Sequence, residues 1–131
     1  MYKISVDSDR NLIRAMISGF FTVAEVNAFA HEEQAAVESL HCMPGQHRVL
    51  IDASQCVLQA QEVVAAFAHM VRASPVQARR IAVVADGTLY RMQTRRILDA
   101  DRSAMFETNA DAEAWITEDE LATVWRSNDA A

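Results

Sequence analysis

The 131-residue chain has a net charge of −6 and is 51% hydrophobic and 23% charged. These values predict one globular domain, and they argue against general nucleic-acid binding. The first ten residues lack the apolar stretch of a signal peptide, so a cytoplasmic location is expected. The longest apolar runs are too short to span a membrane, and the two cysteines, Cys42 and Cys56, imply a reducing compartment without a disulfide framework.

The first third of the chain predicts a β-hairpin followed by a helix. Apolar and polar residues alternate over 2–6 and again over 13–17, on either side of a turn cluster. Thr22 and Glu25 then have the spacing of a capping box, which marks a helix start. The Pro-Gly pair at 44–45 ends this helix.

The rest of the chain alternates between strands and helices. Val49 to Ile51 is predicted to be a short buried strand. The later predicted elements are a helix over 61–73, a strand over 81–85, a helix over 88–101 and a strand over 104–107. They are followed by a helix that Asn109 caps and that runs through Trp115, and by a helical tail over 117–131. This order predicts a single α/β domain over 1–131, with a mostly parallel or mixed sheet of about five strands, an N-terminal hairpin and four to five helices.

Four stretches of this chain carry a family resemblance. They are Gly19-Phe20, VLIDAS (49–54), RRIAVVAD (79–86) and MFETNADAEAWI (105–116). Over residues 2–117 the chain resembles the SpoIIAA-like group of STAS domains, the fold of bacterial anti-sigma-factor antagonists. That group is structurally related to the lipid-binding CRAL-TRIO (Sec14-like) domain. The resemblance implies either a protein-interaction role or the binding of an apolar ligand.

The phosphoserine signature of switching STAS domains is missing from this chain. In those domains a serine follows the strand and lies at a helix N-terminus, where a phosphate is well placed. The corresponding residues here, 57–61, contain no Ser, Asp or Gly. Ser54 is the nearest hydroxyl and lies about one turn too early, so we expect it to be a loop or capping residue.

No catalytic, metal or cofactor site is predicted. Asp52 and Asp86 follow buried strands, where α/β proteins often bind ligands, although cap or turn roles are the alternative. The histidines and cysteines lack paired ligand spacing, and His41 and His47 are expected to be exposed. Nucleophile motifs and phosphate loops are also absent, so we expect no enzyme activity.

Arginines are concentrated in the middle of the chain. Residues 72–102 hold seven Arg and three acids, whereas 103–131 hold one Arg and seven acids. On a helix over 88–101 extended by one residue, Arg91, Arg95 and Arg102 would share one face. This face is our candidate site for an anion or an acidic partner, and a solvated face paired with nearby acids is the alternative.

Two apolar groups complete the candidates. Leu121, Val124 and Trp125 form a short apolar edge in the tail, which packs either on its own domain or on a neighbouring subunit. An apolar pocket between sheet and helices would be lined by aromatic residues. The candidates are Phe20, Phe21, Phe29 and Phe67.

The leading hypothesis from the sequence is a non-enzymatic interaction or regulatory module, homodimeric and bound to a protein partner. The alternative is a carrier of a small apolar molecule or lipid. A cavity between sheet and helices would favour the carrier, and a filled core would eliminate it.

Overall fold

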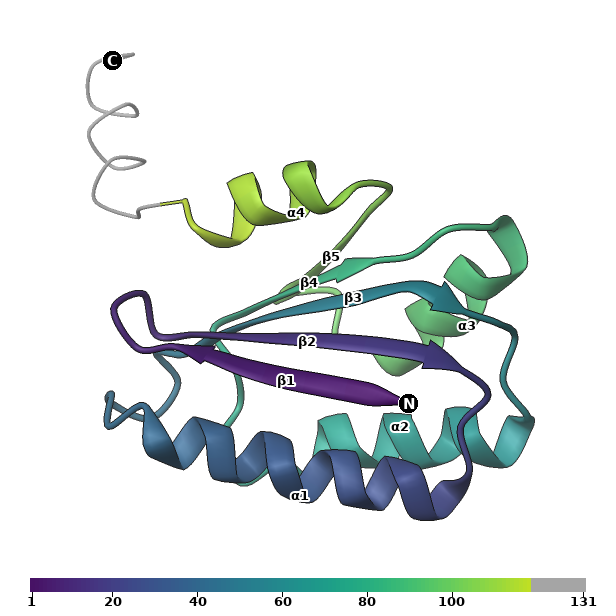
Figure 1. Ribbon diagram of the computed structural model, residues 1–131, viewed down its shortest axis with the longest axis horizontal. Helices are drawn as coiled ribbons and strands as arrows, with labels where there is room; N and C mark the ends of the chain where they lie inside the picture. The colour runs from purple at the N-terminus through teal and green to yellow at the C-terminus, as the bar shows by residue number, and fades with distance from the viewer. Residues whose placement is uncertain (119–131) are drawn as a thin grey trace.

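The computed structural model describes residues 1–118, apart from the side chains at 88 and 89, as one five-stranded sheet with four helices (Figure 1). The strands are β1 (Tyr2–Asp7), β2 (Leu12–Gly19), β3 (Arg48–Cys56), β4 (Arg80–Val84) and β5 (Ser103–Phe106). The helices are α1 (Val23–Ser39), α2 (Gln61–Ala73), α3 (Thr88–Ile97) and α4 (Asn109–Ile116). The predicted α/β architecture and N-terminal hairpin are confirmed. The predicted tail contacts of Leu121, Val124 and Trp125 lie outside the described residues.

The sheet has the strand order β1-β2-β3-β4-β5. β1 pairs antiparallel with β2, and every later neighbouring pair is parallel. The carboxyl ends of β2, β3, β4 and β5 therefore meet at one end of the sheet, toward the right in Figure 1. We call this end the carboxyl edge. Ligands of open parallel sheets commonly bind at such an edge.

One face of the sheet is covered by α1, α2 and α3; α1 and α2 lie below the sheet in Figure 1, and α3 lies at its right-hand end beside α2. Because side chains alternate along a strand, every second residue of β2, β3 and β4 points into this layer. The buried strand residues of this face are Ile13, Ala15, Ile17, Val49, Ala53, Ile81 and Val83. Val26, Phe29, Ala36 and Leu40 complete the core from the α1 side, at helical spacing.

The opposite face is covered by α4, above the sheet in Figure 1. Leu12, Leu50, Ala82 and Val84 of the sheet pack there against Ala112 and Ile116. Arg14 of β2 reaches toward this helix and donates hydrogen bonds to both carboxylate oxygens of Glu113 and one to Asp7. The eight-residue helix α4 is thus held to the sheet by a small apolar contact and by the ion pair between Arg14 and Glu113.

The N-terminal cap of α1 is the predicted one, whereas that of α4 is a different residue. Thr22 accepts a hydrogen bond from the Glu25 backbone N–H and the Glu25 carboxylate accepts one from Thr22 N–H, which confirms the capping box. At α4 the cap is Thr108 rather than the predicted Asn109. The Asn109 side chain instead donates to Asp52 of β3, 3.0 Å away.

Two elements differ in length from the prediction. β3 runs to Cys56 instead of ending near residue 51, because Gln55 and Cys56 continue to pair with β2 after a register shift. α3 ends at Ile97 rather than near residue 101. Asp99 accepts hydrogen bonds there from the Asp101 backbone and the Arg102 guanidinium, and this turn replaces the last helical turn.

Candidate functional site

Apolar side chains are exposed at the carboxyl edge. Phe20 follows β2, and Val57 and Leu58 follow β3; they are 72%, 43% and 44% exposed. Since Gly19 and Cys56 are paired neighbours in the sheet, the two segments that carry these residues leave it side by side. We call Phe20, Val57 and Leu58 the edge cluster.

Hydrogen bonds from Gln59 fix the loops that present the edge cluster. Its side-chain amide donates to the carbonyls of Gly19 and Val57, and its amide oxygen accepts from the N–H of Phe21. Gln93 of α3 bonds both the N–H and the carbonyl of Gln59. Sequence analysis missed this role. The available signal was Gln59 itself, a residue with a long side-chain amide in the loop between β3 and α2.

The start of α2 carries no hydroxyl group. Its N-cap is Ala60, which makes no side-chain cap hydrogen bond. Ser54 lies inside β3, and its hydroxyl donates to Asp52 at 2.6 Å. A phosphate on Ser54 would therefore meet the Asp52 carboxylate, a repulsive arrangement.

The two strand-end acids have local structural roles. Asp52 lies inside the extended β3, where the pairing with β4 stops, and so is not at the strand end as predicted. Partial burial raises the pKa of Asp52, but hydrogen bonds from Ser54 and Asn109 outweigh it and leave this pKa below its ordinary value. Asp86 is exposed and accepts a hydrogen bond from the N–H of Gly87.

The predicted arginine face is divided by the end of α3. Arg91 and Arg95 border one surface groove of about 370 Å³ beside β5, and Arg91 forms an ion pair with Glu107. Arg102 lies beyond the helix and borders a different groove with Arg72. Its guanidinium is held by Asp99, Gln77 and the carbonyl of Ala78. Placing Arg102 on the same face was therefore wrong, because the helix ends before it.

The layer between the sheet and α1 to α3 contains two adjacent apolar cavities of about 70 Å³ each. Phe29 borders both cavities and Phe67 borders one. Phe21 is buried behind them, with its ring centroid 5.4 Å from that of Phe67. Phe20 points to solvent, so its predicted place in the pocket was wrong. Phe21, its neighbour, takes the inward position and is only 5% exposed.

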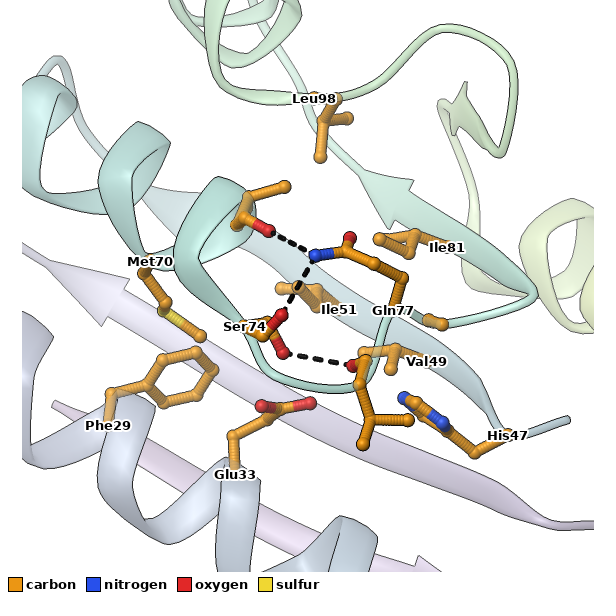
Figure 2. Close-up of a pocket in the computed structure, with 13 residues that line it drawn as sticks. Phe29, Glu33, His47, Val49, Ile51, Met70, Ser74, Gln77, Ile81 and Leu98 are labelled. Carbon is orange, nitrogen blue, oxygen red and sulfur yellow. Dashed lines mark hydrogen bonds between the residues drawn. The ribbon is translucent and has the colours of Figure 1, made fainter. Parts of the chain in front are cut away.

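Two polar residues lie in the first of these cavities (Figure 2). His47 is only 2% exposed, which contradicts its expected exposure. Glu33 of α1 is half-buried at the same site. The sequence held signals for both positions. His47 is in step with Val49 and Ile51 on the inward side of β3, and residue 33 continues the inward stripe of Val26 and Phe29.

Residues 1–118 contain no helix long and apolar enough to cross a bilayer. The same part of the chain has no group of three or more His, Cys, Asp or Glu side chains that could hold a metal ion.

Comparisons with known proteins identify the fold. No family model and no curated protein matches this chain. Among solved structures, it is similar to an uncharacterised protein of the DUF3478 family with a SpoIIAA-like fold from Shewanella loihica, with a TM-score of 0.67, 16% identity and coverage of 88% of this chain and 93% of that one. An anti-sigma factor antagonist from Mycobacterium paratuberculosis matches with a TM-score of 0.61 and 15% identity, over 90% of this chain and 96% of that one. The chain therefore has a SpoIIAA-like fold of the STAS type.

Proposed function

We propose that this chain is a non-enzymatic interaction module that binds a protein partner at its carboxyl edge, without a phosphoserine switch. The observation that carries the proposal is the exposed edge cluster on loops that Gln59 and Gln93 hold in place. Exposed apolar side chains on a preorganised surface favour protein binding, because little ordering entropy is lost there. The similarity to an anti-sigma factor antagonist supports a protein as the partner.

The lack of a switch follows from the same loop. A phosphorylation switch needs an accessible hydroxyl at a helix N-terminus, and Ala60 occupies that position in α2. We therefore propose constitutive binding, regulated by the abundance of the partner. A second copy of this chain is one such partner, and the cytoplasmic location stays a prediction.

Phe20→Asp combined with Leu58→Asp is the test of this surface. We expect the double variant to fold, because both side chains are exposed, and to lose at least about thirtyfold in partner affinity, the effect of removing one interface hot spot. Pull-down followed by titration of the recovered partner measures the loss. Light scattering of the purified protein shows whether a homodimer depends on the same residues.

Met43→Asp is the matched control, since Met43 is 74% exposed but lies in the loop before β3, at the opposite end of the sheet. It should retain the partner. Charge reversal at Arg91 and Arg95 tests whether their groove extends the surface to an acidic partner. Equal binding by the edge double variant and the wild type would contradict the proposed surface.

A second candidate function is the carriage of a small apolar molecule in the layer between sheet and helices. The two cavities favour it. They are far below the roughly 300–1,000 Å³ of typical ligand sites, so a whole lipid does not fit this conformation. Met70 borders both cavities, and rotation of this flexible side chain would join them.

Native mass spectrometry of freshly purified protein tests the carrier function. We expect an added mass that disappears on denaturation if the cavities hold a ligand from the cell. A bare mass, with no shift when small apolar probes are added, would contradict it.

A further inference from the structure

The cavity between α1, α2 and the first half of β3 combines an apolar wall with two polar side chains that make no hydrogen bond within the described residues. Phe29, Val49, Ile51, Met70 and Leu98 supply the apolar wall. Figure 2 shows the imidazole of His47 and the carboxylate of Glu33 turned toward the interior from two sides. The cavity lies away from the carboxyl edge and is independent of the proposed protein-binding surface.

The His47 side chain is buried without a hydrogen-bond partner. Its Nδ1 atom is fully enclosed and finds no donor or acceptor within the described residues. Leaving such a buried group unpaired is unfavourable, so a ligand that pairs with it gains affinity. Burial also lowers the pKa of His47, so the ring is neutral at physiological pH and one of its nitrogens is an acceptor.

Glu33 is the second polar group of the cavity; it is half-buried and also borders the open groove beside His69. No hydrogen bond or ion pair to its carboxylate occurs in the part of the chain that the structure describes, and burial raises the pKa of Glu33. No charged side chain contributes to this shift; His69 of α2 borders the neighbouring groove and is exposed. A carboxylate that keeps its charge here accepts hydrogen bonds and donates none.

The other polar side chains of this cavity are already occupied. Gln77 donates to the carbonyls of Val71 and Ser74, and its oxygen accepts from Arg102. Ser74 donates to the carbonyl of Val76. These bonds, drawn in part in Figure 2, fix the loop after α2. His47 and Glu33 remain as the two groups there able to bind an incoming molecule.

We infer that this cavity binds a small apolar molecule through a hydrogen-bond-donating head group, an amine or an alcohol, held between Glu33 and His47. The inference rests on the carrier function proposed above and names its ligand class. A donor satisfies both an ionised Glu33 and an acceptor nitrogen of His47. A carboxylate head would instead bring a second negative charge beside Glu33, which disfavours acids.

The probes for this site are n-butylamine, n-butanol and butyrate, which share chain length and differ in head group. Titrations followed by NMR should show the amine, the alcohol or both shifting the His47 ring signals and binding at least about tenfold more tightly than butyrate, the effect of one charge-assisted hydrogen bond. A preference for the amine over the alcohol identifies a cationic ligand.

Three variants assign the head-group contacts. Glu33→Gln should weaken amine binding about tenfold and alcohol binding less, because it removes the charge but keeps the shape. His47→Phe should weaken both. Glu38→Gln is the control: Glu38 is an exposed acid further along α1, and its replacement should change nothing.

The outcomes separate the two levels of the proposal. If no probe binds, the carrier function and this inference fail together. If butyrate binds the wild type as tightly as butylamine, or if the variants bind all probes like the wild type, the carrier function stands and the polar-head inference is overturned. The His47 ring signals of the wild type provide the result even where a variant does not fold.

Discussion

Phe29→Ala should lower the free energy of unfolding by about 3–5 kcal/mol, the usual cost of removing a fully buried phenylalanine. The Phe29 ring is 2% exposed, and its centroid lies 5.3 Å from that of Tyr2 and 6.4 Å from that of Phe67. These ring contacts add to the burial of area. Two cavities already border Phe29. Few neighbouring side chains can therefore move into the space that the removed ring would leave. Urea denaturation with an unchanged m-value measures the loss.

Phe20→Ala is the matched control, because it removes the same side chain from an exposed position. We expect a change within about 0.5 kcal/mol. A large loss from Phe20→Ala, or a small one from Phe29→Ala, would contradict the assignment of Phe20 to the surface and Phe29 to the core.

These two residues also show what the sequence pattern could predict. Val26, Phe29 and Leu40 recur at helical spacing, a pattern that predicts Phe29 on the inward stripe of α1, and Phe29 lies there in the core. At Phe20-Phe21 no periodic element was available, since both residues lie in a connection. Composition alone cannot decide which of two neighbouring aromatic residues is buried. Tertiary contacts hold Phe21 inside: its N–H donates to the Gln59 side chain and its ring packs against that of Phe67.

The element order was predictable because each element has its own local signal. The capping box, the Pro-Gly stop and the apolar runs each mark a boundary that tertiary packing respects. The ends of β3 and α3 were not predictable in this way. β3 is extended by pairing with β2 across a register shift, and α3 is cut short by the Asp99 turn with Arg102. Both ends depend on contacts that no helical or strand period in the sequence marks.

The candidate sites depend on polar residues that interrupt an apolar pattern. Asp52 and Ser54 point to the α4 side of β3, and His47 and Glu33 point into the helical layer. A sequence analysis that seeks charged residues in loops overlooks polar residues at inward positions of regular elements. Testing each polar residue against the period of its strand or helix would have found His47 and Glu33.

Ile116→Ala should cost about 2–5 kcal/mol and loosen α4 from the sheet. Ile116 is fully buried and packs with Ala112 on the β2–β4 surface. An eight-residue helix has little stability of its own, so its docking depends on this contact. Hydrogen exchange should show early loss of protection in α4 while α1 and α2 remain protected, because they pack on the other face.

Glu113→Gln on the same helix tests whether the charged contact holds α4 instead. Arg14 binds both oxygens of the Glu113 carboxylate, but the three side chains of the network with Asp7 are all partly exposed. Water screens such pairs, so we expect a loss of at most about 1 kcal/mol. If Glu113→Gln destabilised the protein more than Ile116→Ala, the ion network rather than the buried isoleucine would hold the helix. The smaller effect we expect follows from magnitude: removing buried apolar area and leaving a cavity outweighs weakening a solvent-screened pair.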